Sequence, residues 1–312
     1  MTRAVFFDHD GGLDDFLSLL LLLSYDDVDL LGISVTPADT LIEAAVPATR
    51  KILDLGGRSD VPVAGGTLEG RHPFPMEWRV DAYRVNDLPV LNQREGDPAA
   101  PIADVPGQEL MARTLAGAPE PVTVLETGPL TNLAWVFDHY PDAEGNVKEL
   151  VLMGGALDVP GNVQEPGHDG TAEWNIYWDP PAAKRVFDSA IPVTMFALDA
   201  TNHVPVTPEF RRAFGLQYGH PFSAAAGSIW AMTSGWEVAV GKGLPYFCWD
   251  TLATSSLARP DLCTYRDVRC DVVTEGPSEG RTLPTADGRP VRAADRVDAD
   301  GFYAHALETL RR

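Results

Sequence analysis

Near the start of the chain, Phe6-Phe7-Asp8-His9-Asp10-Gly11-Gly12-Leu13-Asp14-Asp15 stands between two apolar segments. Residues 4–7 form a short apolar run, and residues 16–23 form a longer, largely apolar one. A short apolar run, a Gly-Gly turn and a long apolar run predict a buried strand, a tight turn and a helix. The aspartates would then lie at the carboxyl end of the strand and in the first turn of the helix, where open α/β sheets bind their ligands.

Four aspartates, at positions 8, 10, 14 and 15, fall within eight residues of this stretch. One interpretation is that Asp14 and Asp15 only complement the dipole of the following helix, but it leaves Asp8 and Asp10 without a role. Mutual repulsion makes such a cluster costly unless a cation lies among the oxygens. Hard cations such as Ca²⁺ and Mg²⁺ take oxygen ligands of this kind. The stretch therefore favours a divalent-cation site.

Strand and helix patterns alternate in the segments that follow. Residues 28–35 and 61–64 have the pattern of buried strands, and residues 41–55 between them that of a helix that stops at Gly56-Gly57. This β-α-β-α-β order predicts a parallel sheet with right-handed crossovers. Further strands are expected at 122–125, 150–153 and 192–198, a terminal hairpin at 265–273 and 289–297, and helices at 107–118, 208–236 and 301–310. The expected fold is α/β, a single domain over residues 1–312 with a mostly parallel, Rossmann-like open sheet flanked by helices.

Two long segments, residues 65–106 and 162–175, are predicted to be loops. Segments of this length inside a compact domain are usually functional or disordered. The first carries two large aromatic residues, Phe74 and Trp78, beside prolines. From the pattern alone, two interpretations stay open: these rings stack on a flat ligand, or they pin the segment to the core.

The composition excludes several classes of partner. The chain has 312 residues, 45% of them hydrophobic, and a formal net charge of −21. Nucleic acids and anionic membranes bind basic patches, so neither is expected as a partner. Three cysteines without a metal-binding spacing indicate a reduced setting. Because the first residues run directly into the predicted strand and no apolar run reaches membrane-spanning length, a cytoplasmic protein is expected.

A series of motifs, in order along nearly the whole chain, resembles those of the nucleoside hydrolase family. The family's N-terminal signature is Asp-x-Asp-x-Gly-x-Asp-Asp, which residues 8–15 match. The resemblance continues through Thr127-Gly128-Pro129-Leu130-Thr131-Asn132, Met153-Gly154-Gly155, Asn162, Glu173-Trp174-Asn175, Asp179-Pro180 and Asp250. It implies the family's open α/β sheet and hydrolysis of the N-glycosidic bond of ribonucleosides to free base and ribose.

The details are similar to the purine-specific (inosine-adenosine-guanosine-preferring) subgroup. The signature opens Asp-His-Asp-Gly, and residues 73–78 match that subgroup's Pro-Phe-Pro-x-Glu-Trp loop. Position 249 is Trp, where broad-specificity and pyrimidine-preferring members usually carry His. In the purine-specific subgroup two tryptophans clamp the purine, and their positions match Trp78 and Trp249. The resemblance thus favours stacking for the aromatic loop, and purine ribonucleosides as substrates.

The resemblance also implies roles for individual residues. The implied ligands of one calcium ion are Asp10, Asp15, the backbone carbonyl of Thr127 and Asp250, with water and ribose hydroxyls completing about 6–8 oxygens. Asp10 would be the general base that takes the proton of the attacking water, through an oxocarbenium-like transition state. Ribose binding is implied for Asp14, Asp39, Met153, Asn162, Glu173 and Asn175. Base binding is implied for Phe74, Glu77, Trp78, Tyr246 and Trp249, and indole faces would help to protonate the leaving purine.

The chain departs from the subgroup at two positions. Gly12 stands where purine-specific members carry Asn, so one polar contact to ribose is expected to be missing, worth about 0.5–1.5 kcal/mol. Lys242 stands where the subgroup has a loop Arg, and lysine lacks arginine's bidentate geometry. His9 is interpreted as a structural residue of the turn. The resemblance further implies a homodimer, with an interface that the sequence does not identify.

Other functions compete with purine nucleoside hydrolysis. A haloacid-dehalogenase-type phosphatase would use Asp8 as nucleophile and Asp10 as acid/base, but it needs a downstream lysine, and none of the chain's three lysines precedes an Asp-Asp pair. A calcium-dependent nucleoside- or ribose-binding protein on the same fold would not require the base, so the intact aspartates favour an enzyme. A ribonucleoside hydrolase of different base preference is the third alternative.

Overall fold

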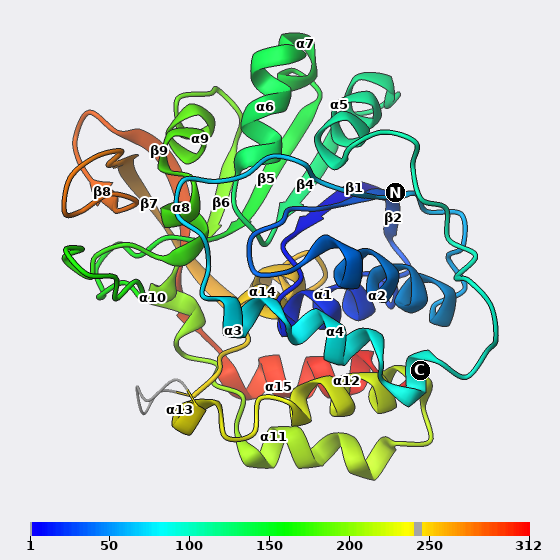
Figure 1. Ribbon diagram of the computed structural model, residues 1–312. Coiled ribbons are helices and arrows are strands. Elements are labelled where there is room, and N and C mark those ends of the chain that lie inside the picture. Colours follow the sequence, from blue (N-terminus) through cyan, green and yellow to red (C-terminus); the bar gives the residue numbers. More distant parts are fainter. Residues whose placement is uncertain (1, 240–244) are drawn as a thin grey trace.

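Strand β1 (Arg3–His9) lies in the interior of the central sheet. In the computed structural model, which describes residues 2–239 and 245–312, this sheet has nine strands in the order β3-β2-β1-β4-β5-β6-β9-β7-β8 (Figure 1). The strands that form parallel pairs with β1 or with one another are β2 (Val28–Val35), β3 (Val63–Gly65), β4 (Val122–Glu126), β5 (Val147–Met153) and β6 (Val193–Phe196). The predicted α/β fold with a mostly parallel sheet is thereby confirmed.

The C-terminal strands extend one edge of this sheet. They are β7 (Cys263–Val272), β8 (Thr282–Pro284) and β9 (Arg289–Val297). β7 pairs antiparallel with both β8 and β9, and β9 pairs parallel with β6. The predicted terminal hairpin is therefore joined to the parallel sheet through β9.

Helices cover both faces of the sheet (Figure 1). Along β1, Val5 and Phe7 are buried in one apolar core and Phe6 in the other, as expected for a strand with two covered faces. The core that contains Phe6 is shared by α5 (Gly107–Gly117), α6 (Thr131–His139) and α9 (Pro180–Phe187). The opposite core is shared by α1 (Leu13–Leu22), α2 (Ile42–Leu55), α14 (Trp249–Ser255), α12 (Pro221–Ala231) and α15 (Ala299–Thr309).

Shorter helices replace some of the expected loops and strands. Residues 65–106 are not structureless, because Ala82 and Val85 are buried and tie this segment to the core. The expected strand 192–198 ends at Phe196, and the expected helix 208–236 is broken into several pieces. The short helices are α3 (Met76–Arg79), α4 (Asp81–Asn86), η1 (Pro89–Leu91), α7 (Pro141–Glu144), α8 (Trp174–Trp178), α10 (Leu198–Thr201), α11 (Pro208–Ala213), η2 (Phe214–Gln217), α13 (Trp236–Ala239) and η3 (Pro260–Leu262).

Helix α1 is buried along its whole length. It packs against α2, α12 and α14, which explains why its sequence is apolar on every side. The same burial carries Asp14 and Asp15, in its first turn, into the interior, where they are 2% and 0% exposed. The helix that the opening stretch predicts thus places two carboxylates where water alone cannot solvate them.

The turn between β1 and α1 depends on Gly11 and His9. Gly11 has a φ of +81°, and a Cβ there would lie 2.7 Å from the Thr40 Cβ, so the turn requires glycine. The Gly11 N–H donates to His9 Nδ1 at 3.1 Å, and His9 Nε2 lies 3.2 Å from the Thr49 hydroxyl oxygen. Burial lowers the pKa of His9 to about 3, so the imidazole is neutral and structural.

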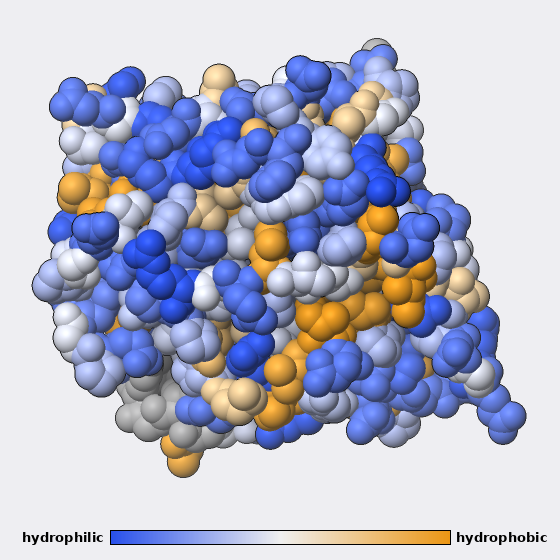
Figure 2. All heavy atoms as spheres, turned by 45° about the horizontal axis from the view of Figure 1, so that its top comes forward, coloured by the Kyte–Doolittle hydropathy of each residue, from blue (hydrophilic) through white to orange (hydrophobic). Residues whose placement is uncertain are grey.

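The face of the molecule seen in Figure 2 is mostly hydrophilic, with a narrow band of apolar residues across it. This pattern agrees with an apolar core enclosed between the sheet and its helices. Within the part of the chain that the structure describes, no helix is long and apolar enough to cross a bilayer.

Candidate active site

A cavity opens at the carboxyl ends of β1 and β4, which lie side by side within the sheet. The chain leaves β1 for α1 on one face and leaves β4 for α6 on the other, which makes this a switch point of the sheet, the usual ligand site of open α/β folds. The cavity has a volume of about 360 Å³, within the range of small-molecule sites. Asp10, Thr127 and Met153, at the carboxyl ends of three strands, line it.

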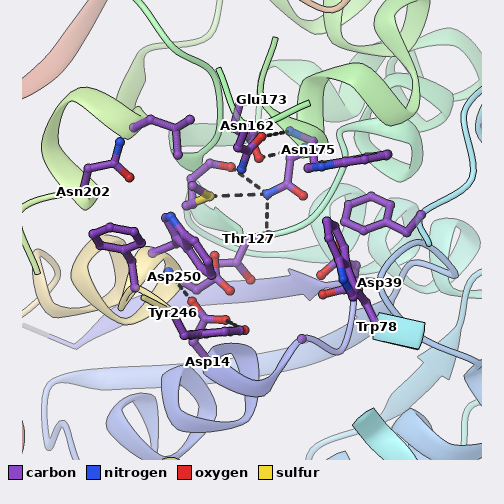
Figure 3. A pocket seen from close by; sticks show the side chains of 18 of the residues that line it. Asp14, Asp39, Trp78, Thr127, Asn162, Glu173, Asn175, Asn202, Tyr246 and Asp250 are labelled. Atoms are coloured by element: carbon purple, nitrogen blue, oxygen red, sulfur yellow. Dashed lines mark hydrogen bonds between the residues drawn. The ribbon is translucent and has the colours of Figure 1, made fainter. Parts of the chain in front are cut away.

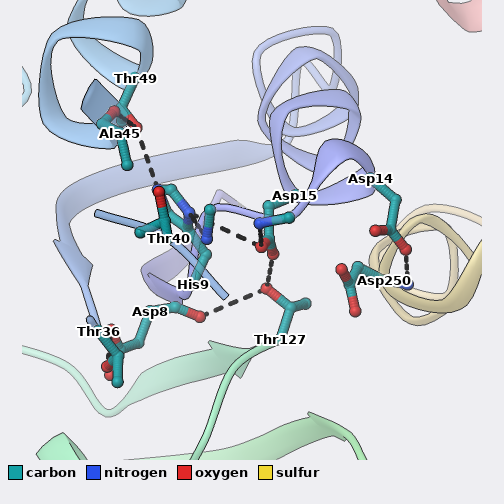
Figure 4. Close-up of polar contacts among 12 residues, drawn as sticks. Asp8, His9, Asp14, Asp15, Thr36, Thr40, Ala45, Thr49, Thr127 and Asp250 are labelled. Carbon is teal, nitrogen blue, oxygen red and sulfur yellow. Dashed lines mark hydrogen bonds and ion pairs between the residues drawn. The ribbon is translucent and has the colours of Figure 1, made fainter. Parts of the chain in front are cut away.

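The first wall is built by α1 and α14, which meet through Asp14. Its Oδ1 accepts a hydrogen bond of 2.7 Å from the Tyr246 hydroxyl, and its Oδ2 accepts one of 3.0 Å from the backbone N–H of Asp250. Figure 4 shows Asp14 and Asp250 directed toward one another from these two helices. Asp14 and Asp250, which are far apart in the sequence, are thus brought to one side of the cavity.

Asp15 lies behind the cavity wall rather than in it. Its Oδ2 accepts a hydrogen bond of 2.8 Å from the Gly12 N–H, and its Oδ1 accepts one from the Thr127 hydroxyl (Figure 4). These bonds hold the turn after β1 against the turn after β4. Asp15 therefore fixes the relative positions of the two strand ends from which Asp10 and Thr127 face the cavity.

The opposite wall is positioned by backbone groups (Figure 3). Glu173 caps α8: its Oε1 accepts from the Asn175 N–H at 2.9 Å, and its Oε2 accepts from the Gly155 N–H at 2.9 Å. The Asn175 amide nitrogen donates to the Thr127 carbonyl at 2.9 Å, and Asn162 Oδ1 accepts from the Trp174 N–H at 3.1 Å. These polar side chains, which resemble ordinary loop residues in the sequence, are held in fixed orientations.

The carboxylates of the cavity carry strongly perturbed pKa values. Burial raises the pKa of Asp10 well above its ordinary value, and the charges of Asp15 and Asp39 raise it further. Burial raises the pKa of Asp15 to about 7, with a contribution from Asp14. The pKa of Asp250 is raised well above its usual range by burial and then by Asp14. A nearby positive charge would stabilise the ionised form of these clustered carboxylates.

The oxygen donors implied for calcium lie at this end of the cavity. Asp10 and Asp250 line it, the Thr127 carbonyl faces Asn175, and Asp15 lies just behind. Over residues 2–239 and 245–312, no three Asp, Glu, His or Cys side chains are arranged as a metal cluster as they stand. The donor set is nevertheless all oxygen and its carboxylates are buried, so its chemistry fits a hard divalent cation.

Aromatic rings form the third side of the cavity. In the view of Figure 3, Trp78 lies on one side of the cavity, and Tyr246 lies on the other side together with Asp14. The Trp78 ring centroid is 5.5 Å from that of Trp174, and the Tyr246 centroid is 4.6 Å from that of Trp249. Most of the residues predicted to bind a base thus surround one apolar space next to the carboxylates.

The structure brings together nearly all of the residues singled out in the sequence. Those that line the cavity are Asp10, Asp14, Asp39, Phe74, Trp78, Thr127, Met153, Asn162, Glu173, Asn175, Tyr246, Trp249 and Asp250. Glu77 is exposed and outside the lining, so base binding by this residue is not supported; α3 directs Trp78 rather than Glu77 inward. Lys242 lies outside the described residues.

Several lining residues were not anticipated from the sequence. They are Pro160, Gly161, Gln164, Trp174, Leu198, Asn202, Trp236, Pro245 and Phe247. Trp174 carries a signal, because it stands between two motif residues, Glu173 and Asn175. The others carry none, because ordinary loop and helix patterns surround them.

Comparison with known proteins identifies the family of this chain. The family model described as "Inosine-uridine preferring nucleoside hydrolase" matches residues 5–304. The chain belongs to the nucleoside hydrolase family. Members of this family are enzymes that hydrolyse the N-glycosidic bond of ribonucleosides. This membership argues against the phosphatase alternative, and so does the position of Asp8, which is fully buried and does not line the cavity where a phosphate ester would bind.

The relatives of this nucleoside hydrolase carry names that state different base preferences. The crystal structure of an inosine-uridine preferring nucleoside hydrolase from Bacillus anthracis is 38% identical, with a TM-score of 0.93 over 99% of both chains. A pyrimidine-specific ribonucleoside hydrolase RihA from Shewanella woodyi is 37% identical over 213 residues, which cover 67% of this chain and 64% of the relative's length. A purine-preferring ribonucleoside hydrolase from Gardnerella vaginalis, 24% identical with a TM-score of 0.81 over 99% of this chain and 98% of that one, shows the shared fold alone.

These comparisons support the family and not the predicted subgroup. The curated relatives are named pyrimidine-specific, so they lend no support to purine preference. They also do not identify the cation. The base preference and the metal of this nucleoside hydrolase are therefore matters of proposal.

Proposed function

We propose that this protein hydrolyses the N-glycosidic bond of purine ribonucleosides to free base and ribose. The observation that carries the proposal is that Asp10 and an indole-rich wall line the same cavity. A nucleoside needs both environments at once, a polar one for ribose and water and an apolar one for the base. The cavity volume of about 360 Å³ is of the size that a small ligand occupies.

Asp10 is the general base in this proposal. It is 4% exposed and lines the cavity, so its carboxylate meets the space where a water would attack C1′. The positive charge that develops on the ribose ring is stabilised by the surrounding carboxylates, Asp14 and Asp250. A calcium ion, when bound by Asp10, Asp15, Asp250 and the Thr127 carbonyl, would supply charge that orients ribose hydroxyls and acidifies water.

The ribose-binding side chains are held before a substrate arrives. Glu173 is oriented by backbone N–H groups, and Asn175 is oriented by the carbonyls of Thr127 and Met153. Such fixed groups lose little conformational entropy on binding, which favours a reaction that depends on the exact placement of C1′.

Purine preference rests on the aromatic wall. Trp78 and Trp249 both line the cavity. Indole faces stacked on a purine would attract the positive charge of its protonated form, which makes the base a better leaving group. Trp249 occupies the position where pyrimidine-preferring members usually carry His. Preference for pyrimidines, as the curated relatives are named, is the competing outcome.

The test is hydrolysis of inosine, guanosine, adenosine, uridine and cytidine, with release of reducing sugar measured in the presence of Ca²⁺. We expect turnover of the three purine nucleosides and slower turnover of the two pyrimidines. Faster cleavage of uridine than of inosine would overturn the proposed base preference, but it would still support hydrolysis of ribonucleosides. Binding of nucleosides by calorimetry without any release of sugar would instead support a binding protein. We also propose a homodimer, for which light scattering after gel filtration gives the mass directly.

A further inference from the structure

Trp236, in α13, is one of the aromatic lining residues that the sequence does not single out. Its ring centroid lies 5.7 Å from that of Trp78 at an interplanar angle of 47°. It also lies 5.2 Å from that of Tyr246 at 80°, an edge-to-face contact. Trp236 therefore touches proposed base-binding residues from two distant parts of the chain.

These contacts make a continuous row of rings. The row runs from Trp78 through Trp236 and Tyr246 to Trp249, with centroid separations of 5.7, 5.2 and 4.6 Å. Because the first and last members are the two proposed stacking residues, Trp236 and Tyr246 join them around the base side of the cavity. Trp236 is half-buried and cavity-lining, unlike the core residue Trp230, which is 1% exposed.

We infer that Trp236 binds the base of the substrate directly, as a third indole in the wall of the base subsite. The inference rests on the proposed nucleoside site and adds a specificity-determining residue to it. Edge-to-face and tilted aromatic contacts of this spacing are favourable, and a base is stabilised by each aromatic face that it meets. Its position between Trp78 and Tyr246 assigns Trp236 a contact with the two-ring system of a purine, which extends further along the row than a pyrimidine ring.

The inference predicts a loss in base binding that is measurable without turnover. We expect Trp236→Ala to weaken binding of the free bases hypoxanthine and adenine, measured by calorimetry, by about 3- to 10-fold. The loss for uracil is smaller, since a single ring offers less surface. In steady-state assays kcat/KM for inosine falls by a similar factor, mainly through KM. Trp236→Phe restores most of the binding, because it keeps an aromatic face.

A matched control is Trp135, a half-buried tryptophan in α6 that stacks on His139 and does not line the cavity. Trp135→Ala leaves hypoxanthine binding unchanged. If Trp236→Ala behaves like this control, the inference is overturned. Base binding by the wild type without nucleoside hydrolysis would remove the proposed activity and still allow the Trp236 contact to be measured.

A double-mutant cycle separates a direct contact from support given through Trp78. If Trp236 only holds Trp78 in place, its removal has no effect on hypoxanthine binding in a Trp78→Ala background. A direct contact predicts that at least about half of the loss in binding free energy persists in that background. Complete disappearance of the loss would overturn the inference. Circular dichroism melting of each variant confirms that the comparison is made between folded proteins.

Discussion

The Tyr246 hydroxyl donates a hydrogen bond of 2.7 Å to Asp14 Oδ1, across 232 positions of sequence. This bond joins the segment before α14 to the first turn of α1. It couples the aromatic wall of the cavity to its carboxylates, because Tyr246 also contacts the Trp249 ring at 4.6 Å between centroids. A substitution in the aromatic wall is therefore expected to affect the carboxylates, and a substitution among the carboxylates is expected to affect the aromatic wall.

Tyr246→Phe tests this coupling. The Tyr246 hydrogen bond lowers the pKa of Asp14, which burial raises, so its removal moves that pKa further upward. The acid limb of the pH profile of kcat/KM should shift to higher pH, and kcat/KM at neutral pH should fall about 10-fold or more, as for a lost hydrogen bond to a charged group. Tyr218→Phe, at a side chain that is 60% exposed, is the control. An unchanged acid limb would contradict the coupling.

Asp10→Asn tests the general base. The substitution keeps the size of the side chain and removes its ability to accept a proton, so kcat should fall by about 10²- to 10⁴-fold. In the absence of Ca²⁺ the melting temperature should not fall, because burial and neighbouring charges raise the pKa of Asp10, and a neutral side chain relieves that repulsion. Asp142→Asn, at an exposed aspartate, should change neither quantity. Near-wild-type turnover by Asp10→Asn would exclude its role as base.

Trp249→Ala tests leaving-group activation. A purine needs a proton to leave, whereas p-nitrophenolate leaves without one. We therefore expect a large loss of kcat on inosine and a small loss on p-nitrophenyl riboside. Equal losses on the two substrates would show that Trp249 only shapes the cavity. Trp135→Ala, away from the cavity, should spare both reactions.

Thermal unfolding with and without Ca²⁺ tests the cation site. The pKa of Asp15 is about 7 in the fold against an ordinary value of 3.8. Its protonation therefore stabilises the metal-free fold fully below about pH 4, and this stability is lost as the pH rises through about 7. A cation takes the place of the proton, so Ca²⁺ should raise the melting temperature more at pH 8 than at pH 5. At a Ca²⁺ concentration about 100 times the dissociation constant, bound Ca²⁺ raises the free energy of unfolding by about 2.7 kcal/mol.

A gain from Ca²⁺ that is equal at both pH values would place the cation away from these carboxylates. Asp250→Asn should reduce the gain, because it removes one proposed ligand charge. Mg²⁺ in place of Ca²⁺ shows how far the site discriminates between the two hard cations.

Gly12→Asn tests the departure from the purine-specific subgroup. A Cβ at Gly12 would lie 3.2 Å from Asp39 Oδ2 and 3.6 Å from Asp14 Oδ1, beside the cavity. An amide there can add one hydrogen bond to ribose if Asp39 shifts by a few tenths of an ångström. We expect KM for inosine to fall by about 2- to 10-fold with little change in kcat. Gly117→Asn, at a site with no neighbour within 4 Å of a Cβ, is the control, and an unchanged KM in Gly12→Asn would contradict the expectation.

Much of the site follows from the sequence because its residues sit at strand ends. Asp10 comes directly after β1 and Thr127 directly after β4, and parallel strands bring such positions to one edge. The spacing of Asp14 and Asp15 places both in the first turn of α1. Local periodicity and turn chemistry are sufficient for these placements, since each depends on residues close in the chain.

Other features depend on contacts between distant segments. The resemblance to purine-specific members implies base binding for Glu77, but α3 turns this residue outward. No local pattern indicates a role for Trp236, whose place in the cavity comes from its contacts with Trp78 and Tyr246. The pattern of residues 65–106 predicts a loop, although Ala82 and Val85 are buried there. Short helices such as these are stabilised by burial rather than by propensity, so local patterns predict them poorly.

The sequence alone determined the strand, turn and helix around Asp8–Asp15, the parallel α/β sheet and the acidic character of the site. Hydrophobic periodicity and glycine placement carry that information locally. Only the tertiary structure decided which of these carboxylates face the cavity. Asp10 and Asp14 line it, while Asp15 lies behind it and accepts hydrogen bonds from Gly12 and Thr127. The reason is physical, because adjacent residues of a helix point in directions about 100° apart, and packing between segments far apart in sequence selects the direction that meets the ligand.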